Sequence, residues 1–124
     1  MSEETGVVGA PIDIPARIAA VPPGEWRNEV LTAVNGSLVR LGVIEGEYHW
    51  HSHAVEDEFF MTLEGELLLD LRAEDGSVET VTLFPHEAYT VPAGVVHRTR
   101  AHERTSILMV EQATVVPAGE RAGE

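Results

Sequence analysis

Apolar residues recur along this chain in short runs, separated by glycine, proline, asparagine and aspartate. Several runs alternate apolar and polar positions, which is the period of a strand with one buried face. Asn35-Gly36 joins two such runs and is typical of a tight hairpin turn with positive φ. The predicted strands are Val30–Val34, Leu38–Val43, Glu47–His53, Glu58–Leu63, Leu67–Arg72, Val78–Leu83, Ala88–Val91, Val96–Arg100 and Ser106–Glu111.

Only Ile14 to Val21 has a helical pattern, and Pro22-Pro23-Gly24 should end this short N-terminal helical segment. Many short strands between regularly spaced turns predict an all-β sandwich or barrel. The 124 residues suit a single domain, residues 1–124. We expect a core barrel at about 29–113, an N-terminal arm at 1–28 and a flexible C-terminal tail at about 117–124.

A histidine pair lies on one of the predicted strands. His51 and His53 are two residues apart and therefore face the same side. Glu58 and His97 would have to reach them from neighbouring strands. Burying unpaired imidazoles costs about 1–3 kcal/mol each, and a divalent ion would remove that cost. The four residues are therefore candidate metal ligands; the alternative is that the histidines face solvent on the polar side of an amphipathic strand.

The spacing of these residues resembles the two motifs of the cupin superfamily. His51-x-His53, Glu58 and Gly65 are similar to the first motif, and Pro92-x-Gly94-x-x-His97 is similar to the second. The resemblance reaches from about Gly46 to about Ala101, with departures at Gly46, at Ala101 and at His86, which occupies a glycine position. It implies a small single-domain bacterial cupin with a double-stranded β-helix (jelly-roll) barrel.

The resemblance also implies a divalent transition metal. Nitrogen and oxygen ligands without a thiolate suit Mn, Fe, Ni, Co or Zn. Asp57 and Glu58 both satisfy the motif spacing, but only Glu58 keeps the six-residue distance to Gly65, so we choose Glu58.

Three further residues are candidates for a substrate pocket around the ion. Phe60 and Thr62 share the inward parity of Glu58, and His49 shares that of His51. His49 is also the candidate catalytic residue, because an imidazole can transfer a proton near neutral pH. Tyr48, Trp50 and Phe59 have the opposite parity and should pack elsewhere. Arg98 and Arg100 should point away from the metal, and His102 should lie in a solvated loop.

Composition narrows the classes of partner. Eight basic side chains, all arginine, stand against 21 acidic ones, a net charge of −13 that argues against nucleic acid and anionic membranes. The absence of lysine excludes Schiff-base chemistry, and the absence of cysteine excludes disulfides and thiolate ligands. The chain has neither a signal peptide pattern nor an apolar run of ~18 residues. We therefore expect a cytoplasmic protein with a small-molecule ligand.

The leading interpretation is a small metalloenzyme, of dioxygenase or isomerase type, that acts on a small polar or carbonyl-bearing substrate. The alternative is a non-catalytic module that binds or stores a small molecule through the same metal. Small cupins generally pair, and the segment from Gly6 to Ile12 could add a strand to a neighbour's sheet. A homodimer is therefore expected.

Overall fold

The computed structural model describes residues 9–114 and 120–121. It has one short helix and otherwise strands and turns. In chain order, the elements are α1 (Ile14–Ala19), β2 (Arg27–Val34), β3 (Ser37–Glu47), β4 (His51–Ser52), β5 (Glu58–Glu64), β6 (Leu67–Arg72), β7 (Val78–Leu83), β8 (Ala88–Val91), β9 (Val96–Gln112) and β10 (Glu120–Arg121).

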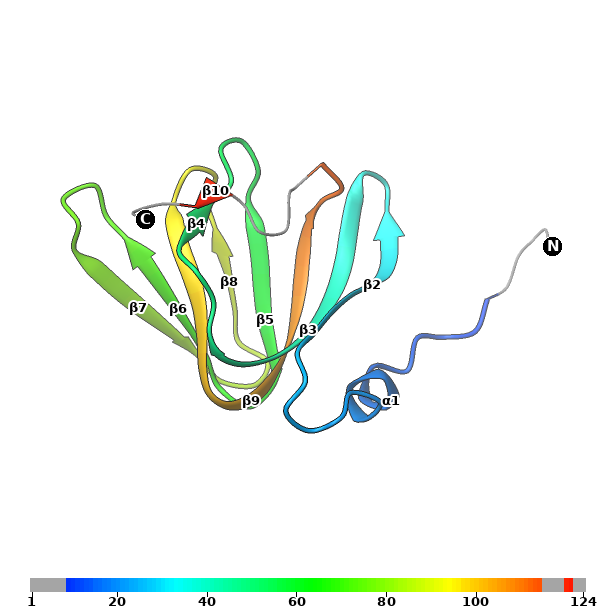
Figure 1. Ribbon diagram of the computed structural model, residues 1–124. Coiled ribbons are helices and arrows are strands. Elements are labelled where there is room, and N and C mark those ends of the chain that lie inside the picture. Colours follow the sequence, from blue (N-terminus) through cyan, green and yellow to red (C-terminus); the bar gives the residue numbers. More distant parts are fainter. Residues whose placement is uncertain (1–8, 115–119, 122–124) are drawn as a thin grey trace.

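Strand β9 joins the two halves of the barrel. Its first part pairs with β4 and β6, its last part pairs with β5, and β3 runs beside it along most of its length. In Figure 1 the strand descends through one sheet, bends at the base and rises through the other. All strand pairs are antiparallel. The prediction of an all-β jelly-roll barrel is confirmed.

The main core fills the space between the two sheets. Strand β5 shows why the sequence forms this core, because its residues alternate between buried and half-buried positions, with Glu58, Phe60 and Thr62 on the buried face. The other strands contribute apolar side chains from their inner faces. The buried members of this cluster are Ile44, Phe60, Leu67, Leu69, Leu83, Val91, Ala101, Ile107 and Met109.

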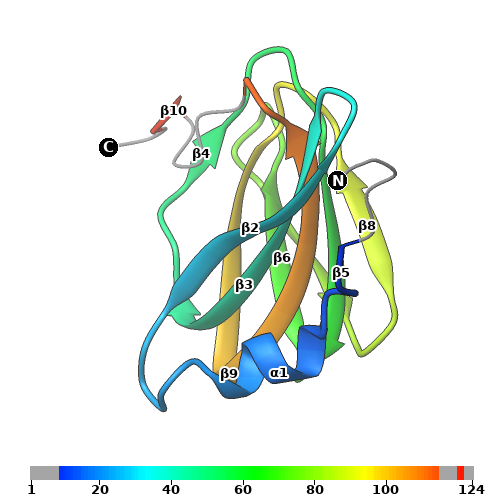
Figure 2. The ribbon, with the colours of Figure 1, turned by 90° about the vertical axis from the view of Figure 1, so that its right-hand side faces the viewer.

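Helix α1 lies at the base of the barrel in Figure 2, where it covers a second, smaller apolar cluster. Asp13 is its N-cap and accepts a hydrogen bond from the Ala16 N–H at 3.0 Å. Ile18 is the buried residue of the helix and packs with Leu41 and Val43 of β3. The helix ends at Ala19, two residues before the predicted end at Val21.

The first two strands are longer than predicted, since β2 begins at Arg27 and β3 ends at Glu47, and larger differences occur elsewhere. The predicted strands 96–100 and 106–111 are one continuous strand, which places the exposed His102 in β9 and not in a loop. The predicted strand 47–53 is reduced to His51–Ser52, because an irregularity between Ile44 and Gly46 precedes a break at residues 48–50. Strand β10 was not predicted.

Turn predictions agree better with the structure. β2 and β3 form the predicted hairpin, with positive φ at Asn35 (54°) but not at Gly36. His86 has φ 74°, as its glycine position in the motif implies. The expected C-terminal tail and the N-terminal pairing segment lie mostly outside the described residues; of Gly6 to Ile12, residues 9–12 are described and form no strand. The single-domain boundaries stay a prediction.

Candidate metal centre

The structure brings the four candidate ligands together inside the barrel. His51, His53, Glu58 and His97 are all buried, and one potential ligand atom from each lies within 4.8 Å of the others. His51 on β4 is paired directly with His97 on β9, and Glu58 is the first residue of β5. His53 follows β4. The neighbouring segments that carry His51, His53 and Glu58 therefore meet the distant His97 of β9 in a group that could hold a metal ion.

Backbone carbonyls orient two of the imidazoles. His51 Nδ1 lies 3.0 Å from the carbonyl oxygen of His49, and His97 Nδ1 lies 2.9 Å from that of Val95. A carbonyl oxygen only accepts, so Nδ1–H donates in both rings and Nε2 carries the lone pair in the neutral form. That is the tautomer in which Nε2 can ligate a metal.

The remaining contacts test whether these residues suit an ion. His97 Nε2 lies 3.3 Å from Glu58 Oε1, so two acceptors face each other when His97 is neutral. His53 Nε2 is 3.2 Å from the same oxygen, yet its direction is not that of a hydrogen bond, and this buried nitrogen has no hydrogen-bond partner. An unpaired buried nitrogen costs about 1–3 kcal/mol. The donor set fits a divalent cation, which would satisfy all of these atoms at once.

Burial and neighbouring charges shift the pKa values of three of the candidate ligands. Burial lowers the pKa of His51 to about 4, which leaves this imidazole neutral and able to ligate. Burial alone would raise the pKa of Glu58, but the close imidazoles of His53 and His97 outweigh it and hold this pKa below its ordinary value. Contact with Glu58 raises the pKa of His53. Protons therefore compete with a metal at His53.

Asp57, the alternative to Glu58 as the carboxylate ligand, accepts a backbone hydrogen bond instead. The Ala93 N–H donates to Asp57 Oδ1 at 2.9 Å, and the Gly94 N–H donates to the carbonyl of His53 at 2.8 Å. These two bonds tie the turn at residues 92–94 to the segment that carries the histidines. The structure thus includes Glu58, and not Asp57, in the four-residue group.

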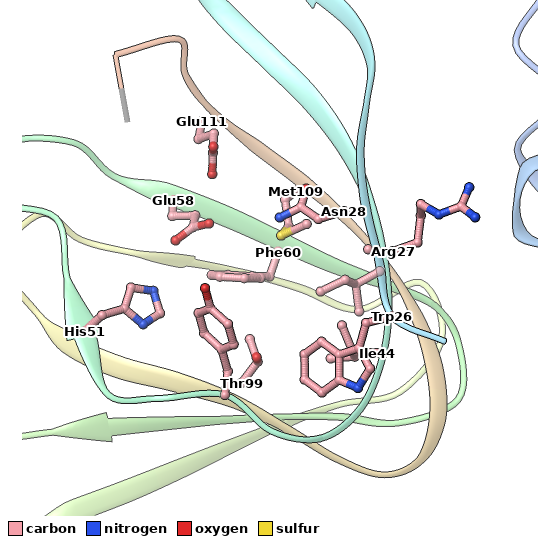
Figure 3. A pocket seen from close by; sticks show the side chains of 13 residues that line it. Trp26, Arg27, Asn28, Ile44, His51, Glu58, Phe60, Thr99, Met109 and Glu111 are labelled. Carbon is pink, nitrogen blue, oxygen red and sulfur yellow. The ribbon is translucent and has the colours of Figure 1, made fainter. Parts of the chain in front are cut away.

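A cavity of about 200 Å³ adjoins the group, and His51 and Glu58 belong to its wall (Figure 3). The wall comes mainly from β2, β3, β5 and β9, and most of it is apolar or aromatic. The lining residues are Trp26, Arg27, Asn28, Gly42, Ile44, Tyr48, His51, Glu58, Phe60, Thr99, Ile107, Met109 and Glu111. A small molecule in this cavity would lie beside two of the candidate ligands.

Of the three residues expected to line a substrate pocket, one lines the cavity and two do not. Phe60 lines the cavity as expected, but Thr62 does not, because it is fully buried and its hydroxyl donates to the Leu83 carbonyl at 2.9 Å. His49 does not line it either, whereas Tyr48 does. The break at residues 48–50 interrupts the alternation on which the parity argument depended. His49 stacks beside Tyr48 with ring centroids 4.2 Å apart, and its catalytic role stays a prediction.

The sequence reasoning missed Glu111. This carboxylate is buried, lines the cavity and points toward Glu58 in Figure 3. Burial and the neighbouring Glu58 carboxylate raise the pKa of Glu111 to about 7, against the opposing effect of Arg40. Parity could have found it, because Glu111 shares the inward face of β9 with Ile107 and Met109.

Outside the barrel, Trp50 anchors the histidine segment. The guanidinium groups of Arg72 and Arg98 lie 4.4 and 4.7 Å from its ring centroid. Arg98 and Arg100 both donate to Asp70, at 2.8 and 2.7 Å. Both arginines therefore point away from the candidate ligands, as expected.

Comparison with known proteins identifies the family. A family model described as a cupin domain matches residues 37–111. The uncharacterized protein YdbB of Bacillus subtilis (strain 168) is 45% identical over 84 residues, which are 68% of this chain and 71% of that protein. The chain belongs to the cupin family.

Solved structures share the fold. A cupin-2 domain protein from Shewanella frigidimarina is 31% identical and superposes with a TM-score of 0.73, covering 82% of this chain and 93% of that chain. A hydroquinone 1,2-dioxygenase from Sphingomonas sp. TTNP3, with 4-hydroxybenzoate bound, has a TM-score of 0.72 at 19% identity, covering 85% of this chain but 32% of that one. Among the described residues, no helix is long and apolar enough to cross a membrane.

Proposed function

We propose that this cupin is a small metalloenzyme that binds one divalent transition metal, Mn, Fe, Ni, Co or Zn, through His51, His53, Glu58 and His97. Its substrate would be a small polar or carbonyl-bearing molecule held in the adjoining cavity. One observation carries the proposal: the buried Nε2 of His53, which has no hydrogen-bond partner, lies among three other ligand atoms beside that cavity. Leaving a buried group of this kind without a hydrogen bond costs about 1–3 kcal/mol, and a metal ligated by this nitrogen would remove the cost.

The chain's own residues supply binding and orientation. His51 and Glu58 reach both the ligand group and the cavity wall, so a bound molecule would lie against them. Phe60, only 2% exposed, forms an apolar wall that limits access of water to this face. A bound metal of this class supplies Lewis-acid polarisation or oxygen chemistry. Oxygenase and isomerase chemistry are the two reaction types that we propose.

The proposal of oxygenase chemistry is supported by the similarity of the fold alone. The hydroquinone 1,2-dioxygenase shares the barrel, which says that the barrel can host such chemistry but leaves the site to decide. The proposal of isomerase chemistry depends on the same Lewis-acid role of the metal. An activity test must therefore include both oxygenase and isomerase reactions.

Elemental analysis of protein purified without a polyhistidine tag tests the metal. We expect about one equivalent per chain in the wild type, and a large loss in His51→Ala and His97→Ala. His102→Ala is the matched control, because this histidine is exposed on the same strand as His97. Equal metal content in all four proteins would refute the proposal.

Oxygen uptake and substrate isomerisation would then be measured on the loaded protein with a panel of diketones, phenols and sulfur acids. Turnover that disappears in His97→Ala would support the enzyme. Metal binding with ligand binding but no turnover on any member of the panel would favour the binding or storage module instead.

We also propose that the protein forms a homodimer. Within the described residues, β2 is an edge strand that pairs only with β3, and its residues Val30 and Val34 are 45% and 57% exposed. Exposed apolar edges favour pairing with a second chain. Light scattering after size exclusion would give the mass directly, and a monomer at micromolar concentration would contradict this part. A cytoplasmic location stays a prediction.

A further inference from the structure

We infer that the cavity beside the candidate metal centre selects a small uncharged ring compound whose hydroxyl donates a hydrogen bond to Glu111. This names the ligand class for the proposed small-molecule site and so rests on the proposed function. Three features of the wall carry it: the missing side chain at Gly42, the aromatic and apolar surfaces, and the carboxylate that Arg40 holds in place.

The absence of a side chain at Gly42 leaves space for the cavity. It lies inside β3, opposite Ile107 of β9, and its φ is not positive, so the backbone does not require glycine. A Cβ at this position would lie 3.0 Å from Ile107 Cγ1 and 3.0 Å from Met109 Cε. Glycine within a strand weakens it and marks places where something must approach closely. Here a side chain would press on two wall residues and narrow the cavity.

The surrounding walls suit a flat ring. Trp26, Tyr48 and Phe60 present aromatic surfaces, and Met109 adds a polarisable thioether, a favourable partner for aromatic groups. The volume of about 200 Å³ exceeds the roughly 150 Å³ of an apolar cavity that binds benzene. One six-membered ring with a short substituent therefore matches the space.

The polar end of the cavity is built around Arg40. Its Nε donates to Glu111 Oε2 at 2.8 Å, and its Nη1 donates to Asn28 Oδ1 at 3.3 Å. Both acceptors belong to cavity-lining residues, and the Glu111 side chain is only 2% exposed. A single arginine thus fixes two polar groups at the wall, and the buried carboxyl group of Glu111 offers an acceptor oxygen for a ligand's donor.

Charge sets the preference for an uncharged molecule. Glu58 and Glu111 face the same space in Figure 3. Arg27 is the only arginine among the lining residues that the structure describes, and its guanidinium points away from the cavity, 3.8 Å from Glu29. In the metal-free protein an anionic ligand would meet the carboxyl groups of Glu58 and Glu111, and the nearby Arg40 already pairs with Glu111. A hydroxyl donor meets an acceptor and adds no charge.

The test uses metal-free protein, so that no ion contributes to binding. The probes are phenol, anisole and benzoate, which share a ring but differ in donor and charge. NMR titration follows the Trp26 indole N–H and the Met109 methyl group, both in the wall. We expect saturable shifts with phenol, binding at least about tenfold weaker for anisole, which lacks the donor, and no saturation with benzoate at the same concentrations.

Variants locate the binding. Gly42→Val should abolish the phenol shifts, and Gly42→Ala should weaken them if the valine variant does not fold. Gly36→Ala is the matched control, because a Cβ there has no atom within 4 Å. Glu111→Gln should reduce the preference of phenol over benzoate.

The inference falls if benzoate binds as well as phenol, or if Gly42→Ala and Gly36→Ala bind phenol equally. The proposed function fails differently. Protein that takes up no metal yet selects phenol contradicts the metalloenzyme but keeps the inference, whereas protein that binds metal without the phenol preference contradicts the inference alone.

Discussion

His51 and His97 lie directly opposite each other across β4 and β9, with ring centroids 4.4 Å apart, and each Nδ1 contacts the carbonyl two residues before its own position. The same type of contact, with a backbone carbonyl oxygen, therefore orients both imidazole rings.

Replacing either His51 or His97 by Ala should strip a bound metal and lower the melting temperature. An ion at about 100 times its Kd stabilises the native state by about 2.7 kcal/mol. Calorimetry with and without a chelator measures this difference, which should vanish in both variants.

The neighbouring carboxyls should respond differently. Glu58→Gln removes a member of the four-residue group and should weaken metal binding, whereas Asp57→Asn alters only the bond to the Ala93 N–H and should leave metal content unchanged. Elemental analysis of the two variants side by side shows which of the two carboxylates ligates the metal. The reverse result would assign the ligand to Asp57.

His86 occupies a left-handed conformation, with φ 74°, on an exposed turn. A side chain there costs about 1–2 kcal/mol, while glycine loses about 0.5–1 kcal/mol through the entropy of the unfolded chain. His86→Gly should therefore be neutral or up to about 1.5 kcal/mol more stable. Urea unfolding measures it, with His86→Val as the destabilised comparison. A loss above about 2 kcal/mol would mean that the imidazole has a further role.

Gly65 and Gly76 separate backbone strain from crowding. Both have φ close to +90°, but a Cβ at Gly65 would lie 2.5 Å from Thr105 Oγ1 and 3.0 Å from the Arg104 carbonyl, whereas a Cβ at Gly76 has no atom within 4 Å. Gly65→Ala should cost about 1–3 kcal/mol more than Gly76→Ala, because only the former overpacks its surroundings. Equal costs in denaturant unfolding would show that the contact relaxes freely.

Asp70 should make stability depend on acid. Its side chain is 1% exposed and accepts hydrogen bonds from Arg100, Arg98 and Thr80. The bonds from Arg100, with those from Thr80 and Arg98, outweigh burial and hold the pKa of Asp70 below its ordinary value of 3.8. A lowered folded pKa stabilises the protein fully above about 3.8, and this contribution is lost as the pH falls below it.

Asp70→Asn should therefore cost about 3 kcal/mol at neutral pH and reduce the acid dependence of the melting temperature. Glu74→Gln, at an exposed turn position, is the control and should change neither. An unaltered acid slope in Asp70→Asn would contradict the assignment.

His49→Ala tests the residue that sequence parity assigned to catalysis. His49 is outside the four-residue group, so metal content should be retained. If the imidazole transfers a proton, turnover should fall while metal content stays constant. Loss of metal would make His49 a ligand and would remove the acid/base role.

The periodic parts of the fold followed from the sequence. Alternation in β5 predicted the buried face of Glu58, Phe60 and Thr62 correctly, and the glycine position in the motif predicted the positive φ of His86. The four-residue group followed from spacing and from the cupin resemblance together. The alternation in β5 and the φ of His86 depend on local geometry, which a linear pattern encodes.

The remaining features depend on irregularities that the pattern does not encode. The register shift after Ile44 and the break at residues 48–50 put Tyr48, and not His49, on the cavity wall. The polar residues of Arg100 to Arg104 suggested a loop, yet β9 continues through them because β3 supplies a partner strand on both sides of the bend. Tertiary pairing thus outweighed local polarity.

Strand β9 carries His97 near its start and Glu111 near its end, and it pairs with β3, β4, β5 and β6. Opening the strand at His97 would break its pairing with β4 and β6, and opening it at Glu111 would break its pairing with β3. Amide exchange along this strand should require global unfolding and not a local fluctuation. The candidate ligand and the cavity carboxylate thus belong to one cooperative folding unit, and the site persists for as long as the barrel itself does.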